Sequence, residues 1–238
     1  MSIGFGYLAR IGHLYPSGGL CDFEIQAMAP EGVQFVTTRL PFRDTSIESD
    51  RRLVSDLEAH AKLLADAKVD LIAMNCTAAG VVAGPDSVNA RIRQATGIPA
   101  VTTIQAVLAA CDTLHATRIA LMTAYRPEVV DAEIAFFEAR GIEVVTHASQ
   151  PCSTPYEQAM LEPHTWTALA TRLKGDFDAV LISCAGVRVS RVIADIERAA
   201  GKPVVTSNSA LLWFCLETLG IQIRPTGYGV LLASSRSS

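Results

Sequence analysis

Short apolar runs alternate with longer amphipathic segments along most of the chain. Runs of four to six residues rich in Val, Ile, Leu and Thr are typical of buried strands, and the longer segments repeat apolar residues at helical spacing. Because parallel strands need a long crossover, this alternation predicts parallel sheets built from βαβ units. We expect strands at 10–15, 33–38, 70–74, 100–103, 118–123, 143–147, 178–183 and 203–206, and helices at 46–67, 86–96, 104–114, 127–140, 155–175, 188–200 and 209–219.

One pattern of residues occurs twice in the same order. Residues 70–78 (DLIAMNCTA) match 178–186 (DAVLISCAG), and both copies place an Asp six positions before a Cys. Residues 97–108 (GIPAVTTIQAVL) match 201–212 (GKPVVTSNSALL). Shorter matches near two further pairs of strands keep the same order, at separations of 104 to 109 residues. We therefore predict two homologous α/β halves related by a pseudo-twofold axis.

The repeat also sets the expected domain boundaries. The seam falls near residues 112–117, so the first half spans 1–112 and the second spans 113–208. The helix that follows Thr206 corresponds to the one that begins near Ile104. We expect this last segment, 209–238, to return to the first half.

Composition narrows the class of protein. The 238 residues are 50% hydrophobic and 18% charged, which provides a sizeable core and excludes intrinsic disorder. The net charge of −4 argues against a nucleic-acid partner. No uncharged apolar run reaches 18 residues, and the start lacks the basic and apolar regions of a signal peptide. We expect a cytoplasmic protein with no membrane contact, which forms a homo-oligomer.

Two of the six cysteines differ from the others. Cys76 and Cys184 occupy equivalent positions of the repeat, each directly after a predicted strand. Ligands of parallel α/β sheets bind at the carboxyl ends of the strands, so the two thiols are expected to face each other across a cleft between the halves. The other four cysteines, which lack this symmetry, are interpreted as structural: Cys21, Cys111, Cys152 and Cys215.

Backbone N–H groups after each cysteine are free to bind a carboxylate if a helix or tight turn begins there. The same positive end is expected to lower the thiol pKa, so that a thiolate acts as a nucleophile or a general base. This interpretation adds the neighbours of the two cysteines to the candidate substrate-binding residues: Asn75, Thr77, Ala185 and Gly186.

Polar or flexible residues at other strand ends complete the candidate site. Pro16, Ser17 and Gly18 follow the first strand, and Tyr125 follows the equivalent strand of the second half. Tyr125 either donates to a carboxylate or forms a wedge between the halves, and Asn208 either contacts substrate or only helps to cap a helix. The five histidines lack metal-ligand spacing, so we expect no metal, and neither a P-loop nor the nucleophile motif of the hydrolases occurs.

These residues resemble the aspartate/glutamate racemase superfamily, and within it the branch of maleate cis-trans isomerases and arylmalonate decarboxylases. The resemblance implies two flavodoxin-like halves with the site between them and no cofactor. It implies that Cys76 adds to a double bond, that Cys184 delivers or removes a proton, and that Tyr125 binds a substrate carboxylate. The motifs that carry it are YPS at 15–17, NCT at 75–77, TAY at 123–125, SCAG at 183–186, PVVTSN at 203–208 and GYG at 227–229.

The resemblance leaves several reactions open. The decarboxylases carry Gly in place of the first cysteine, so Cys76 favours an isomerase or a racemase. The isomerases carry a substrate-contacting Asn where this chain has Gly19. This difference argues against maleate itself as the substrate, but not against the two-cysteine chemistry. We expect cofactor-independent cis-trans isomerisation of maleate or a related unsaturated dicarboxylate. The alternatives are a racemase of an α-substituted acid, an arylmalonate-type decarboxylase with Cys184 as the proton donor, and a non-catalytic protein that binds a small acid.

Overall fold

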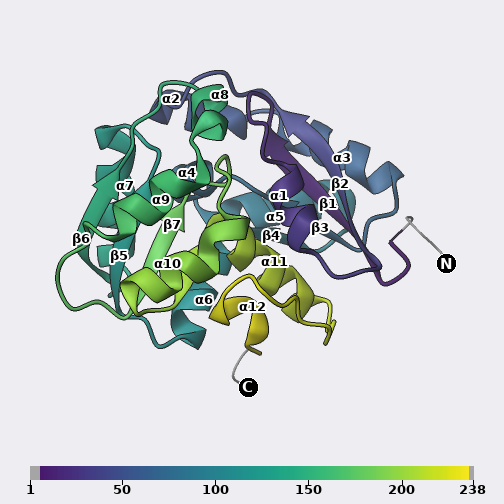
Figure 1. The fold of residues 1–238 in the computed structure, drawn as a ribbon. Helices are drawn as coiled ribbons and strands as arrows, with labels where there is room; N and C mark the ends of the chain where they lie inside the picture. Colours follow the sequence, from purple (N-terminus) through teal and green to yellow (C-terminus); the bar gives the residue numbers. More distant parts are fainter. Residues whose placement is uncertain (1–5, 236–238) are drawn as a thin grey trace.

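The computed structural model describes residues 6–235 and contains two four-stranded sheets, seen as the purple-blue and green halves of Figure 1. The sheets have the strand orders β2-β1-β3-β4 and β6-β5-β7-β8, and all pairs are parallel. This shared order confirms two pseudo-symmetric α/β halves. The strands are β1 (Ala9–Pro16), β2 (Val33–Leu40), β3 (Leu71–Met74), β4 (Ala100–Thr102), β5 (Arg118–Thr123), β6 (Glu143–Ser149), β7 (Ala179–Ser183) and β8 (Val204–Thr206).

Helices cover both sheets and fill the space between the halves (Figure 1). The first half contains α1 (Phe23–Met28), α2 (Ile47–Leu53), α3 (Leu57–Asp66), α4 (Thr77–Ala83), α5 (Pro85–Thr96) and α6 (Thr103–Thr113). The rest of the chain adds α7 (Pro127–Glu138), α8 (Pro155–Met160), α9 (Pro163–Ala170), the 3₁₀ turn η1 (Ser190–Val192), α10 (Ile193–Ala200), α11 (Ser207–Thr218) and α12 (Val230–Ala233).

All eight expected strands are present, with ends within two residues of the prediction, whereas two of the expected helices are divided. The segment 155–175 forms α8 and α9, because Pro163 occupies the first turn of α9 and disfavours helical geometry at the residue before it. The segment 46–67 forms α2 and α3. The prediction also missed α1, α4 and α12, which span only four to seven residues each and are too short for a clear period.

The pseudo-equivalent helices α6 and α11 pack against each other between the halves. Residues 207–216 of α11 are all buried, because this helix is apolar on every side and also contacts α1 and α12. The following segment reaches the first half as well, where the Tyr228 hydroxyl donates to the carbonyl of Ala27 at 3.1 Å. The chain after β8 therefore contacts both halves.

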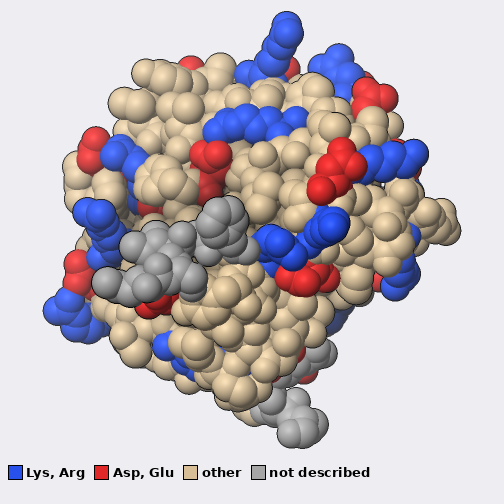
Figure 2. Space-filling view, turned by 90° about the vertical axis from the view of Figure 1, so that its right-hand side faces the viewer, with Lys and Arg blue, Asp and Glu red and all other residues tan. Residues whose placement is uncertain are grey.

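No helix among the described residues is long and apolar enough to cross a membrane. On the face drawn in Figure 2, basic and acidic side chains are interspersed rather than gathered into one basic patch.

Candidate active site

The carboxyl ends of the strands from both halves meet at one small cavity. Its volume is about 30 Å³, which is room for about two water molecules. The first half contributes Pro16, Phe42, Thr45, Asp50, Cys76, Thr77 and Ala78, and the second contributes Tyr125, Pro155, Gln158, Ala185 and Gly186.

Cys76 lies between the end of β3 and the first turn of α4, where it is 8% exposed. Burial raises the pKa of its thiol well above the usual range, and the nearby Asp50 raises it further. A hydrogen bond from the N–H of Ala79 offsets only part of this. The expectation of a lowered thiol pKa at this position is wrong, because loss of water outweighs the backbone N–H groups.

Cys184 occupies the equivalent position after β7 and is 4% exposed. Its own N–H donates to the hydroxyl of Ser207 at 3.0 Å, and the N–H of Gly186 donates to its sulfur at 3.3 Å. Burial is the largest influence on this thiol and raises its pKa, against weaker lowering by Gly186 and by a hydrogen bond with Tyr125. The lowered pKa expected here is also wrong, and both cysteines are protonated near neutral pH.

Two further polar side chains line the cavity beside the cysteines. Asp50 is the fourth residue of α2, is 1% exposed, and has Oδ1 3.9 Å from the sulfur of Cys76. Gln158 is the fourth residue of α8. Its Oε1 lies 3.1 Å from the point where a Cβ on Gly186 would stand, and the Cys184 sulfur lies 3.5 Å from the same point. The sequence reasoning missed both residues.

Five of the substrate-binding candidates line the cavity together with Cys76, namely Pro16, Thr77, Tyr125, Ala185 and Gly186. Ser17 and Gly18 are not among the residues that line the cavity. The Ser17 side chain is exposed and its hydroxyl accepts from the N–H of Phe42 at 3.0 Å, while the N–H of Gly18 donates to the carbonyl of Phe42 at 3.1 Å. These two residues hold the loop that carries Phe42 into the cavity.

Asn75 and Asn208 lie beneath the cavity and join the halves. The side chain of Asn75 donates to that of Asn208 at 2.8 Å, and Asn208 donates to the carbonyl of Ala185 at 3.1 Å. The hydroxyls of Thr77 and Ser207 share a further hydrogen bond of 2.7 Å. This fully buried set fixes the two cysteine loops relative to each other, a positioning role that no spacing in the sequence reveals.

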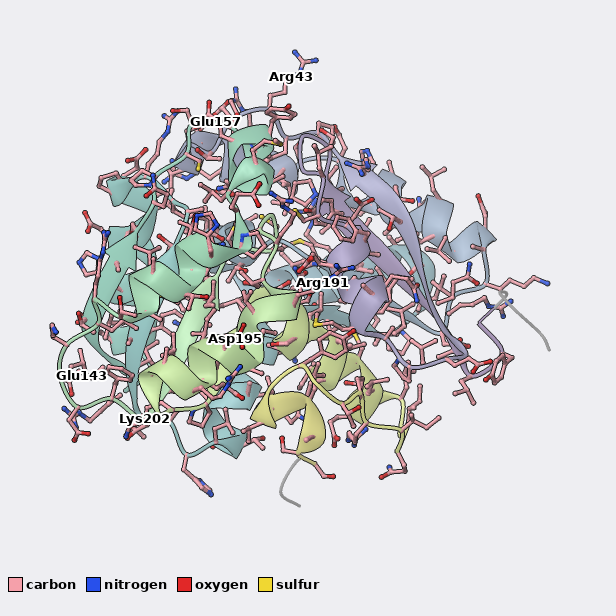
Figure 3. All side chains as sticks on the ribbon, in the orientation of Figure 1. Arg43, Glu143, Glu157, Arg191, Asp195 and Lys202 are labelled. Atoms are coloured by element: carbon pink, nitrogen blue, oxygen red, sulfur yellow. The ribbon has the colours of Figure 1, made fainter. Side chains whose placement is uncertain are left out.

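The electrostatic character of the cavity is acidic. Among the described residues, its lining includes Asp50 but no Lys, Arg or His. Arg43, the neighbour of Phe42, is exposed and projects outward at the end of the molecule where α2 and α8 lie (Figures 1 and 3). No group of three His, Cys, Asp or Glu side chains within residues 6–235 is placed to hold a metal ion.

Comparison with known proteins places this arrangement among enzymes that act on small acids. A sequence model of the family described as arylmalonate decarboxylase matches residues 12–232. A maleate isomerase from Pseudomonas putida is 26% identical over 96% of this chain and 98% of its own. An arylmalonate decarboxylase from Bordetella bronchiseptica is also 26% identical, over 92% of this chain and 94% of its own.

The fold agrees with these sequence matches. The crystal structure of a maleate isomerase from Pseudomonas putida, determined with maleate on a variant, superposes with a TM-score of 0.90. It covers 94% of this chain and 97% of its own, at 25% identity. The two-half fold is therefore shared over nearly the whole chain.

Proposed function

The chain belongs to the arylmalonate decarboxylase family, and from this premise we propose that it is a cofactor-independent isomerase of maleate or a related unsaturated dicarboxylate. The observation that carries the proposal is the pair of buried thiols at equivalent strand ends of the two halves. Cys76 lines one small cavity, and the loop that carries Cys184 contributes Ala185 and Gly186 to the same cavity. One thiol per side suits a flat substrate held between the halves.

The reaction begins when the thiol of Cys76 passes its proton to a neighbouring base and its sulfur forms a bond to one vinyl carbon, while the π electrons move to the other carbon. The resulting carbanion is delocalised into the adjacent carboxylate, where the hydroxyl of Tyr125 stabilises the growing negative charge. The former double bond is now single and rotates. Cys184 delivers a proton to the carbanion and then takes a proton back from the same carbon. The S–C bond breaks, its electron pair returns to sulfur together with the proton that Cys76 had lost, and the trans acid is released.

Packing against Tyr15 explains why residue 19 is a glycine. A Cβ at this position would stand 2.8 Å from the hydroxyl and a ring carbon of Tyr15, so no larger residue fits while Tyr15 keeps its place. Tyr15 is fully buried and accepts a hydrogen bond from the N–H of Cys21. Tyr15 therefore occupies the space in which the resemblance places an Asn of the isomerases, and this chain offers no side chain there.

A second candidate is decarboxylation of a disubstituted malonate, favoured by the family match and by the Bordetella relative. Loss of CO₂ leaves a carbanion, and Cys184 would donate its proton to that carbon. Its buried, protonated thiol suits a donor. The presence of Cys76 favours isomerisation over this reaction, because a decarboxylase needs only one thiol.

Proton NMR in D₂O tests these reactions in parallel. Maleate and an α-aryl-α-methylmalonate are incubated with the enzyme and with a double variant, Cys76→Ala with Cys184→Ala. Growth of the fumarate vinyl signal, lost in the double variant, supports the isomerase. Release of an arylpropionate, or deuterium entering Cα of a saturated acid, supports the decarboxylase or a racemase instead. Binding without turnover would leave only a protein that binds small acids.

We also propose that the enzyme is a cytoplasmic homo-oligomer. All six cysteines are free thiols and buried, which suits a reducing compartment. Large apolar side chains of the first half are exposed, including Leu20 at 47% and Phe23 at 52%, which supports self-association. Light scattering after size-exclusion chromatography tests this, and a mass of one chain at micromolar concentration would contradict it.

A further inference from the structure

The two halves place different side chains at one equivalent position beside their cysteines. Ser46 caps α2 by accepting from the third helical N–H, and Thr154 caps α8 in the same way. The fourth residue of each helix, Asp50 or Gln158, lines the cavity. Asp50 and Gln158 are separated by 108 residues, as are Cys76 and Cys184. The scaffold is therefore the same in both halves, while the group that it presents to the thiol is not.

Asp50 faces Cys76 without a balancing cation. The thiol of Cys76 is the one hydrogen-bond donor recorded for its carboxyl among the described residues, at 3.9 Å from Oδ1. The other titratable groups acting with it are all acidic: Asp44 from the preceding loop, Tyr125 after β5, and Glu133 from α7. A buried carboxyl with no cation is costly to the fold, so an ion-pair role does not explain it. Such groups cluster at functional sites.

Gln158 meets the second thiol with a group that does not titrate. Its side-chain nitrogen donates weakly to the carbonyl of Ala124 at 3.4 Å, and its oxygen is directed toward the loop of Gly186 and Cys184. A carboxamide holds no proton that it can exchange near neutral pH. Helix α8 therefore provides no base that could take the proton of Cys184.

We propose that Asp50 is the proton acceptor for Cys76 and that Gln158, its counterpart, leaves Cys184 as a thiol. The first cysteine is then the nucleophile and the second is the proton donor. In the forward step the S–H bond of Cys76 breaks and its proton moves to Asp50, while the sulfur electron pair forms the S–C bond. When the S–C bond breaks, the proton returns to sulfur. The carboxyl thus starts and ends each cycle unchanged, and the step needs no further reactant.

The acid strengths of the two groups suit this transfer. Burial raises the pKa of Asp50 to about 7, so near neutral pH the carboxyl gains and loses a proton readily. Burial also raises the pKa of Cys76, so its thiol does not ionise on its own at that pH. An acceptor in contact with the sulfur removes the need for a free thiolate.

Alkylation by iodoacetamide from pH 5.5 to 9 tests the proposal without any substrate. Trypsin cleavage after Lys68, Arg91, Lys174 and Arg188 leaves Cys76 and Cys184 as the sole cysteines of their peptides, so mass spectrometry reads each thiol separately. In the parent, the alkylation rate of Cys76 should rise to about pH 7 and then change less than about threefold up to pH 9. In Asp50→Asn it should rise about tenfold per pH unit throughout, because only hydroxide then generates the thiolate.

A second variant tests the same idea from the other half. Gln158→Glu places a carboxyl beside Cys184, and its alkylation rate should gain a plateau that the parent lacks. The control is Glu48→Gln, an exposed acid on the same helix as Asp50, which should change neither profile. A Cys76 profile that Asp50→Asn leaves unchanged overturns the proposal, as does a Cys184 profile indifferent to Gln158→Glu.

The inference rests on the proposed function in one respect, since Cys76 must lose a proton to attack carbon. The two ideas nevertheless fail separately. If maleate is not converted but the alkylation plateau of Cys76 is lost in Asp50→Asn, Asp50 is the proton acceptor and maleate is not the substrate. If fumarate forms but Asp50→Asn keeps the plateau, the protein is the isomerase and Asp50 is not the proton acceptor.

Discussion

The two halves of the molecule repeat one scaffold but not one chemistry. Each has the same strand order, a cysteine directly after its third strand, and a short capped helix that lines the cavity near that cysteine. As the fourth residue of this helix the first half carries Asp50 and the second carries Gln158. Duplication alone would provide two identical thiols, and the difference between these two side chains divides their roles. The predictions below test that division.

Removing either thiol should have the largest effect, and an unequal one. Once a substrate is identified, Cys76→Ala should lower kcat by at least about 10⁴-fold, because the covalent path is lost. Cys184→Ala should lower it by about 10² to 10⁴-fold, the usual contribution of a positioned proton donor. Steady-state rates with the four other cysteines intact give the comparison. Equal losses, with no covalent adduct trapped on Cys76, would contradict the division of roles.

Replacing Asp50 should produce the next largest loss, and one that depends on pH. Asp50→Asn should lower kcat by about 10²-fold or more at pH 8, with KM changed only a few-fold, because the carboxyl acts in proton transfer. The pKa of Asp50 is raised to about 7, so below pH 6 the parent also holds this group protonated and the difference should shrink. Asp50→Glu should restore part of the rate. A loss of equal size at pH 5.5 and pH 8 would indicate a merely structural role.

The sequence predicted the architecture well because its signals are local and repeated. Each strand is a short apolar run with polar ends, and the matched segments around Cys76 and Cys184 give two halves without any knowledge of contacts. Helix ends were less predictable. A continuous apolar period runs through 155–175, but Pro163 divides the segment, and the short α4 follows a cysteine without a periodic pattern.

Site candidates could be named from the sequence only where residues follow strands directly. Cys76, Cys184 and Tyr125 are candidates of this kind, whereas Asp50 and Gln158 lie on helices that return to the cavity from elsewhere in the chain. The repeat offset of 108 residues would have paired these two, but nothing in one sequence indicates that either is buried. The predicted lowering of the thiol pKa values was wrong for a related reason, since burial raises them and the degree of burial is a property of the packed structure.

A second buried acid lies on α7 in the second half. Glu133 on α7 is fully buried and accepts a hydrogen bond from Ser183 through Oε1, and its Oε2 has no hydrogen-bond partner within residues 6–235. Burial raises its pKa to about 8. The folded state therefore binds this proton more tightly than the unfolded state, and stability is lost as pH rises from about 4.5 to about 8.

Glu133→Gln should remove this loss. The free energy of unfolding of the variant should match the parent near pH 5 and exceed it by a few kcal/mol at pH 9, since each unit of pKa shift corresponds to about 1.4 kcal/mol. Urea unfolding at the two pH values measures the difference, with the exposed Glu138→Gln on the same helix as control. A residual decline between about pH 4 and 7 should remain in the variant, because Asp50 still titrates there. A parent with no such pH dependence would contradict the raised pKa values.

The smallest effects come from the two helix caps, which separate the scaffold from the chemistry. Ser46→Ala and Thr154→Ala each remove one side-chain acceptor from a helix N-terminus, so each should cost about 1 kcal/mol of unfolding free energy. Their effects on turnover should differ. Loosening α2 moves Asp50 away from Cys76 and lowers kcat, whereas loosening α8 moves only a carboxamide. Urea unfolding and kcat measured on the same preparations give both numbers. If equal costs in stability came with equal losses in kcat, the position of the helices would matter and the carboxyl would not.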